Sequence, residues 1–122
     1  MRLFIAGRGV EITPEVREHV MRRLRLALTP FSERIIRVAV KLEHYPDGKD
    51  GATNLCKLLV RLAGVPAVVV GQEGADLITT IDRAADRAGS LVDRRLKHSL
   101  STHREHPQLL HKAWTGAAKA WN

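Results

Sequence analysis

The feature that most constrains the fold is a long apolar stripe in the second half of the chain. Its members recur every three or four residues between about residue 74 and residue 99: Leu77, Ile78, Ile81, Ala84, Ala85, Ala88, Leu91, Val92 and Leu96. This spacing places them on one face of an α-helix. Because an amphipathic helix owes most of its stability to packing of its apolar face, the rest of the chain must provide an apolar surface for it.

That surface is predicted to be a β-sheet, because the hydrophobic period changes to two from Ile35 onward. One side of this strand would carry Ile36, Val38, Val40 and Leu42, and the other side Arg37, Lys41 and Glu43. The next strand would carry Cys56, Leu58, Val60 and Leu62 on one side, alternating with Lys57, Leu59 and Arg61. Residues 45–51 and 64–66 have turn composition, and residues 67–70 form a short apolar run. Three consecutive strands with short links predict an antiparallel meander.

A further strand and helix precede the meander. Residues 3–6 form an apolar run closed by two glycines, which predicts a first strand. Thr13, Pro14 and Glu15 are typical of a helix start, since Thr caps free amides, Pro suits the first position and Glu complements the helix dipole. Pro30 ends this helix. The predicted order is β-α-β-β-β-α, an α+β sandwich with two helices on one face of a four-stranded sheet.

Length and composition suit a small domain with a tail. The chain has 122 residues, of which 44% are hydrophobic, enough for a modest core. The apolar pattern decays after Ser101 and Pro107 interrupts it. We therefore expect an α+β domain over residues 1–101 and a flexible basic C-terminal tail over residues 102–122.

The charge balance points to a polyanionic partner. Twenty Lys and Arg oppose thirteen Asp and Glu, which gives a formal net charge of +7. Such an excess favours nucleic acid or an anionic membrane surface, and charge alone does not choose between them. With Cys56 as the only cysteine, no intramolecular disulfide is possible. Neither a signal peptide nor a membrane-spanning apolar stretch is recognisable, so a cytoplasmic location is expected.

The cationic residues gather on the two predicted helices. On the second helix Arg83, Arg87, Arg94 and Lys97 share roughly one side, flanked by Arg95 and His98, and we expect Arg94 and Arg95 to be exposed. If both helices lie on one sheet face, their outward surfaces could join into a positive band that engages RNA phosphates. The predicted RNA-binding residues are Arg22, Arg23, Arg25, Arg83, Arg87, Arg94, Arg95 and Lys97. The alternative is a solvated helix face, in which Asp82, Asp86 and Asp93 neutralise part of the charge through ordinary pairs within the helix.

Metal binding and catalysis are not expected. The spacing of His103 and His106 differs from the four-residue pairing of a zinc helix, and Pro107 disturbs the segment. Cys56 occupies an inferred core position. The trio Asp93, His98 and Ser99 is of a kind that ordinary helix surfaces often present. We therefore expect no enzyme, no catalytic residue, no metal site and no cofactor.

With these elements in place, the chain resembles the bacterial hibernation-promoting factor and ribosome-associated inhibitor family, also described as sigma-factor modulation proteins. The resemblance covers residues 1–99, and its most telling stretches are residues 5–14 (IAGRGVEITP), 16–20 (VREHV) and 71–82 (GQEGADLITTID). The resemblance implies a fold similar to double-stranded RNA-binding domains. It also implies binding to the small ribosomal subunit and its RNA in the channel for messenger and transfer RNA, which inhibits translation during stress or stationary phase, without catalysis.

Residue by residue, the family's basic helix positions match Arg23, Arg87, Arg94 and Arg95. The chain departs from the family at Leu26 and Ser90, where the family usually has basic residues. We expect Lys97 with His98 to replace a basic cluster that the family places one position earlier. Long members append a dimerisation domain that about twenty tail residues cannot supply, so the chain is similar to a short form. The tail, with Arg104, Lys112, Trp114 and Trp121, could follow the messenger channel and stack on bases, or be an unstructured end.

Three functions compete at this point. The first is a translation-silencing factor on the small subunit, a monomer when free and without DNA specificity. The second is a divergent member that acts as a protein-interaction or regulatory module without occupying ribosomes, which the residues at Leu26 and Ser90 favour. The third is peripheral membrane attachment through the basic, Trp-containing tail; the second helix argues against it, because the sheet already needs its apolar stripe.

Overall fold

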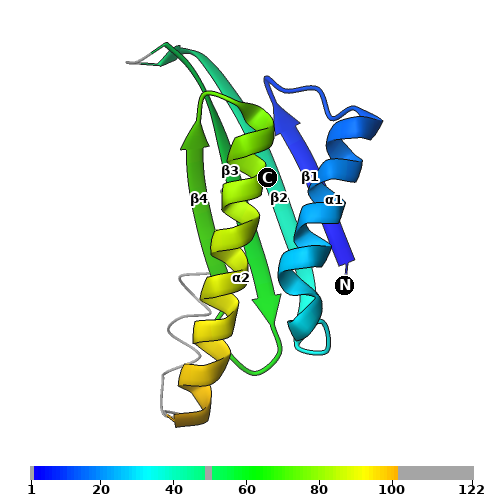
Figure 1. Cartoon of the computed structure of the whole chain (residues 1–122), viewed down its shortest axis with the longest axis vertical. Helices are drawn as coiled ribbons and strands as arrows, with labels where there is room; N and C mark the ends of the chain where they lie inside the picture. The colour runs from blue at the N-terminus through cyan, green and yellow to red at the C-terminus, as the bar shows by residue number, and fades with distance from the viewer. Residues whose placement is uncertain (1, 49–50, 102–122) are drawn as a thin grey trace.

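The computed structural model describes residues 2–48 and 51–101, and the predicted tail over residues 102–122 lies outside the described residues. The elements follow in the order β1 (Arg2–Arg8), α1 (Pro14–Leu28), the short 3-10 helix η1 (Thr29–Phe31), β2 (Ile35–Gly48), β3 (Gly51–Leu62), β4 (Val68–Gly74) and α2 (Leu77–Ser101). Figure 1 shows the two helices side by side in front of the sheet. The predicted β-α-β-β-β-α order is confirmed.

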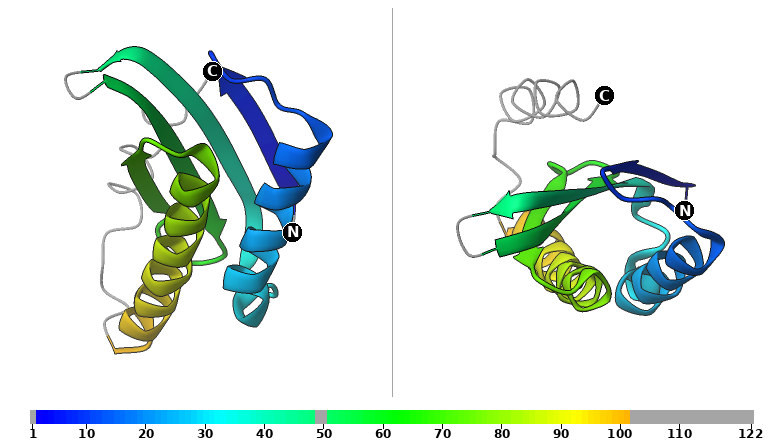
Figure 2. Two further views of the ribbon diagram at one scale, coloured as in Figure 1. Left: turned by 45° about the horizontal axis from the view of Figure 1, so that its top comes forward. Right: turned by 90° about the horizontal axis from the view of Figure 1, so that it is seen from above.

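The sheet has the strand order β1-β2-β3-β4. β2, β3 and β4 pair antiparallel, as the short links predict, whereas β1 pairs parallel with β2. The parallel pairing follows from the position of α1, since two parallel strands need a crossover connection and α1 provides it. Seen from above, both helices cover the same face of the sheet (Figure 2). The α+β sandwich is therefore as predicted.

The core lies between this sheet face and the two helices. It is built from one side of β2, β3 and β4 and from the stripes of both helices: Val20, Leu24, Leu28, Ile35, Val38, Val40, Leu42, Cys56, Leu58, Val60, Leu62, Val68, Val70, Ile81, Ala84, Ala85, Ala88 and Val92. Cys56 is fully buried, and its burial raises the pKa of the thiol to about 12. Its interpretation as a small core residue is confirmed.

The start of β2 corrects one predicted face. Ile36 was expected in the core with Val38, but it is 46% exposed, and Ile35 is buried in its place. The cause is a register shift between Ile35 and Arg37, where β2 pairs with β3 irregularly. Such a bulge changes which side chain faces the core, and the alternation of residues does not reveal it.

The hairpin between β2 and β3 is longer than its composition predicts. Residues 45–51 were expected to form a turn throughout, yet Tyr45 pairs with Thr53 and β2 continues to Gly48. Gly51, which opens β3, has a φ of 95°, a left-handed value that glycine adopts readily. A composition rich in glycine and aspartate marks where a chain can reverse, and here the strands pair almost up to that point.

Both helices begin with a side-chain cap. The Thr13 hydroxyl accepts the Val16 amide at 3.2 Å, with Pro14 at the first helical position, as predicted. At α2 the Asp76 carboxylate accepts the Thr79 amide at 2.9 Å and the Thr79 hydroxyl at 2.8 Å, and these bonds lower the pKa of Asp76. Asp76 therefore fixes the start of α2 at Leu77, three residues later than Gly74, where the helix was expected to begin.

Candidate nucleic-acid interface

The candidate interface is the layer formed by α1 and α2. The two helices approach closely at Gly89, where a Cβ atom would lie only 3.0 Å from the carbonyl oxygen of Ala27. This close packing brings the polar side chains along the seam between the helices within reach of one another. The cations of the two helices consequently fall into separate groups, according to whether they face the seam, the β4 side or the solvent.

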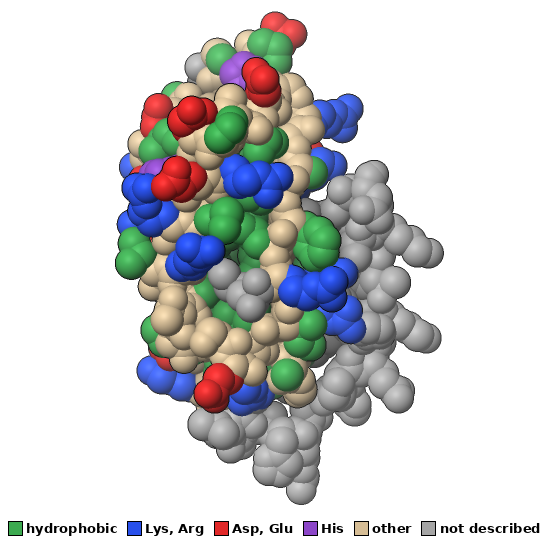
Figure 3. Space-filling model, turned by 90° about the vertical axis from the view of Figure 1, so that its right-hand side faces the viewer, with side chains coloured by type: hydrophobic (Ala, Val, Ile, Leu, Met, Phe, Trp, Pro, Cys, Tyr) green, Lys and Arg blue, Asp and Glu red, His purple; other side chains and the backbone are tan. Residues whose placement is uncertain are grey.

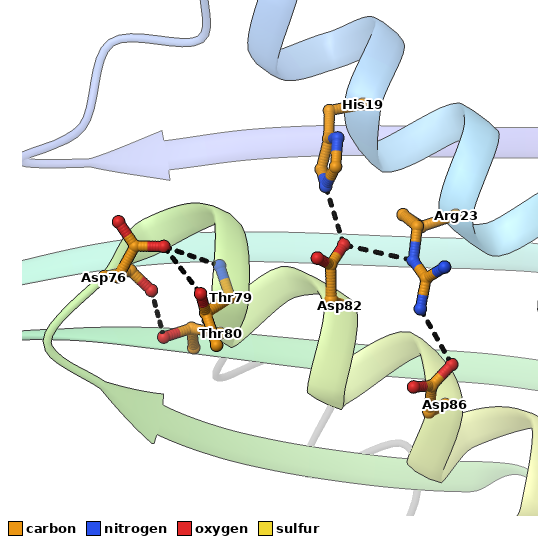
Figure 4. A network of polar contacts seen from close by, with 7 residues as sticks. All are labelled: His19, Arg23, Asp76, Thr79, Thr80, Asp82 and Asp86. Carbon is orange, nitrogen blue, oxygen red and sulfur yellow. Dashed lines mark hydrogen bonds and ion pairs between the residues drawn. The ribbon is translucent and has the colours of Figure 1, made fainter.

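The seam holds an ionic network of four side chains (Figure 4). His19 Nε2 lies 2.7 Å from Asp82 Oδ1, and Arg23 Nε lies 3.0 Å from the same oxygen. Arg23 Nη2 donates a hydrogen bond to Asp86 Oδ1 at 3.0 Å. Arg23 thus bridges two carboxylates of the other helix, and its side chain is 29% exposed.

This network revises the predicted charge balance. Asp82 and Asp86 were expected to neutralise cations of their own helix, but both pair with Arg23 of α1. Arg23 was predicted to bind RNA, and its geometry gives it a second task, the joining of the two helices. Its guanidinium is less available to a phosphate than that of a fully exposed arginine, because a phosphate would have to compete with two carboxylates.

We expect Arg23 to act mainly as an interhelical link. A double-mutant cycle of Arg23→Ala and Asp82→Ala should give a coupling energy of about 1 kcal/mol in urea unfolding, since the pair is partly screened from water. The matched control is the cycle of Arg22→Ala and Glu18→Ala, an exposed pair within α1, for which about 0.3–0.5 kcal/mol is expected. Equal coupling in the two cycles would contradict the assignment.

Two arginines of α2 reach toward β4 and the loop before it. Arg87 Nη1 donates to the carbonyl oxygen of Gly71 at 2.8 Å and to Gln72 Oε1 at 3.1 Å. Arg95 Nη1 donates to the carbonyl oxygens of Pro66 and Ala67 at 3.1 and 3.2 Å. Arg95 is therefore half-buried, and the expectation that both Arg94 and Arg95 are exposed is wrong for Arg95. The reason is that the loop ahead of β4 packs beside α2 and offers unpaired carbonyl groups.

The remaining predicted cations point to solvent. Arg22 pairs with Glu18 at 3.1 Å and Lys97 with Asp93 at 3.0 Å, and their side chains are 64% and 74% exposed. Exposed pairs of this kind are weak, so either cation can exchange its partner for a phosphate. Arg25, Arg83 and Arg94 are exposed and have no ion pair within residues 2–48 and 51–101. We call the group Arg22, Arg25, Arg83, Arg94 and Lys97 the outer helix surface.

Leu26 and Ser90, where the resemblance leads one to expect basic residues, also lie on this layer. Leu26 is 67% exposed and Ser90 is exposed. Ser90 lines a shallow hollow on α2 together with Asp93, Arg94, Lys97 and His98. Neither residue adds charge to the solvent-facing side of the helices, and neither belongs to the core.

The described part of the chain contains neither a metal-binding cluster nor a membrane-spanning helix. Within it, no group of three or more His, Cys, Asp or Glu side chains is arranged to hold a metal ion. His103, His106 and His111 lie outside the described residues. Among the helices of the described residues, none has the length and apolar content needed to cross a bilayer.

Comparisons with known proteins identify the family. The profile of the sigma 54 modulation protein / S30EA ribosomal protein family matches residues 3–99. The N-terminal domain of Protein Y from Thermus thermophilus is 32% identical, with a TM-score of 0.65, over 77% of this chain and 98% of that one. A ribosomal subunit interface protein from Coxiella burnetii has the same fold, with 20% identity and a TM-score of 0.66 over 77% of this chain and 96% of that one. No curated protein matches the chain.

The family is one of ribosome-associated modulation proteins and is not a known enzyme family. The matched range, residues 3–99, spans both helices and all four strands. The resemblance inferred from residues 1–99 is thereby confirmed, and the chain belongs to the sigma 54 modulation protein / S30EA ribosomal protein family.

Proposed function

We propose that this chain binds the small ribosomal subunit in the channel for messenger and transfer RNA and inhibits translation under stress or in stationary phase. The observation that carries the proposal is the outer helix surface, where three arginines have no carboxylate partner in the described residues and two further cations have weak ones. It occurs on the fold of a ribosome-associated family. The chain would act in the cytoplasm, as a monomer when free, with ribosomal RNA as its partner.

The chemistry of the surface supports RNA as the ligand. Arg25, Arg83 and Arg94 present planar guanidinium groups, which can donate two parallel hydrogen bonds to one phosphate. Structured RNA is bound largely through its shape and backbone, so cations on a rigid helix layer suit it without any base-reading side chain. Since each phosphate contact releases counterions, affinity should fall steeply as salt rises.

A second candidate is an interaction module that does not occupy ribosomes. Leu26 favours it, because its side chain is 67% exposed and lines a hollow with other apolar side chains of α1, Pro14 and Met21. An exposed apolar side chain in a hollow can anchor another protein. This candidate requires no binding to rRNA and no effect on translation.

Competition for the channel separates the two candidates. The protein is added to a cell-free translation reaction, and in parallel to small subunits that are either empty or already loaded with messenger and initiator transfer RNA. The proposal predicts inhibition of translation and binding to empty subunits that is lost on loaded ones. Equal binding to both, or no effect on translation, would favour the interaction module.

A further inference from the structure

The face of the sheet opposite the helices carries an unusual set of charges. Side chains alternate along a strand. The residues of β2 that alternate with the core residues Val38, Val40 and Leu42 therefore point away from the helices. The strand register then identifies the cations that share this face: Arg2, Arg8, Arg37, Lys41, Lys57 and Arg61. The acidic residues on the same face within the described strands are Glu43 and Glu73. We call this set of side chains the open sheet face.

Two rows of like charge run across the strands. Arg2 pairs in register with Arg37 and Arg37 with Arg61, which aligns three arginines on neighbouring strands. Lys41 and Lys57 are likewise directly opposite each other. Like charges in such positions are destabilising, so the fold alone gives no reason to place them there. Seen from the side of α1 and β1, Lys and Arg side chains lie on both flanks of the molecule (Figure 3).

The lysine row has an internal counterion. Glu43 is buried between the two lysines, with Oε1 3.5 Å from Lys41 Nζ and 3.7 Å from Lys57 Nζ. The Tyr45 hydroxyl donates a hydrogen bond to the same carboxylate, and this bond, with the two ammonium groups, lowers the pKa of Glu43. The charge of the lysine row is therefore partly neutralised within the protein.

The arginine row has no such balance. Within residues 2–48 and 51–101, neither Arg2, Arg37 nor Arg61 has a carboxylate at ion-pair distance. The guanidinium of Arg37 lies 6.0 Å from the centre of the Phe4 ring, and its Nε makes no hydrogen bond in the same part of the chain. A row of three cations without a counterion is a surface that a polyanion would complete.

An apolar row separates the two cationic rows. Phe4, Ala39, Leu59 and Val69 align in register across all four strands. Phe4 is 51% and Val69 52% exposed, whereas Leu59 between them is buried. Each cationic row is two residues away along the strands, which is about 7 Å. An exposed aromatic ring on a sheet face, flanked by cations, is an arrangement that stacks an unpaired base while the cations hold the phosphates.

We propose that the open sheet face is a second RNA-binding surface and that it takes single-stranded RNA, with a base on Phe4 and phosphates on Arg2, Arg37 and Arg61. This proposal rests on the proposed function in one respect, that the polyanion is RNA. With a second surface, the domain would bind RNA on two opposite faces. Charge argues against other occupants. A second copy would present the same cations, and the segment 102–122 is itself basic, with Arg104, Lys112 and Lys119 against Glu105.

The test measures binding of the full-length chain to a fluorescently labelled twelve-nucleotide polyuridylate by anisotropy across a salt series. The variant Arg37→Gln with Arg61→Gln should bind on the order of tenfold more weakly, and the slope of log affinity against log salt should fall by about 1.4, for two lost phosphate contacts. Phe4→Leu, which keeps an apolar side chain, should weaken binding about fivefold or more through lost stacking.

Two controls match these variants. Glu73→Gln, which removes an exposed negative charge from the same face, should strengthen binding. Arg17→Gln, which removes an exposed positive charge from α1 outside the outer helix surface, should leave oligonucleotide affinity within about twofold. If the first variant does not fold, Arg2→Gln replaces it, since this side chain belongs to the arginine row and is exposed on the edge strand β1.

The proposal would be overturned if the sheet-face variants bound the oligonucleotide with the parental affinity. It would also be overturned if the sheet-face variants and the helix-layer variant lost affinity equally. So would a sheet-face variant that keeps RNA binding and loses association with phosphatidylserine vesicles, which would make this a membrane-binding surface. The assay contains no ribosome, so its failure counts against the open sheet face alone. Failure of the proposed function would show instead as lost ribosome binding by the unaltered protein.

Discussion

Replacing Arg83 and Arg94 together by glutamate is expected to weaken binding to small ribosomal subunits about a hundredfold or more near physiological salt. Each side chain is exposed and has no ion pair in the described residues, so each is free to contact a phosphate. A hydrogen bond to a charged group contributes about 1.5–3 kcal/mol, and the introduced carboxylates add repulsion. Two lost contacts should also reduce the salt slope by about two units.

The matched control keeps the charge. Arg83→Lys with Arg94→Lys should retain most of the affinity and the full salt slope, because the positive charges remain while the bidentate geometry is lost. Thermal unfolding should be the same in all three proteins, since neither arginine contacts the core. Co-sedimentation of the glutamate variant at the parental level would show that the outer helix surface does not bind the ribosome.

Replacing Leu24 by alanine is expected to cost about 2–5 kcal/mol of the free energy of unfolding, measured in urea. Leu24 is 1% exposed and lies in the core beneath α1, so the substitution leaves a cavity. Leu26, two residues along the same helix, is 67% exposed, and the same substitution there should change stability by no more than about 0.5 kcal/mol.

The comparison of the two alanine variants also tests which face of α1 packs against the sheet. If the helix were rotated so that Leu26 faced the sheet, the two costs would be reversed, and Arg22 and Arg25 would no longer both face solvent. Similar costs at the two positions would contradict the described packing of α1. The prediction thus checks the orientation on which the outer helix surface depends.

Much of the fold could be predicted from the periodicity of apolar residues. The stripe of α2 and the alternation from Val38 to Leu42 show which face of each element is buried. They do so because any apolar layer that covers the element buries the same face. The bulge at Ile35 could not be predicted, because it depends on how β2 pairs with β3 and leaves no mark in either strand alone. The extended hairpin at Tyr45 was missed for the same reason.

The site was less predictable, because side chains far apart in sequence decide which cations are available. Their sequence positions predict that Asp82 and Asp86 pair within their own helix. The packing at Gly89 instead places them beside Arg23, about sixty residues earlier. Arg95 likewise finds backbone carbonyl groups that no composition reveals. Helical spacing predicts in which direction a side chain points around the helix axis. Which group it pairs with depends on how the helix packs against the rest of the fold.

The open sheet face could have been found in the sequence. Arg37 and Lys41 alternate with core residues of β2, and Lys57 and Arg61 do the same in β3. Their placement on the side away from the core was predicted, but their alignment into rows required the strand register. Charged residues on the outer side of a strand are common, so only the row of three arginines distinguishes this face.

The most direct test of ribosome binding is co-sedimentation of the unaltered protein with small subunits, large subunits and assembled ribosomes across a salt series. The proposed function predicts saturable binding that requires the small subunit and weakens steeply as salt rises. Absence of binding at low salt, or equal binding to isolated large subunits, would contradict it.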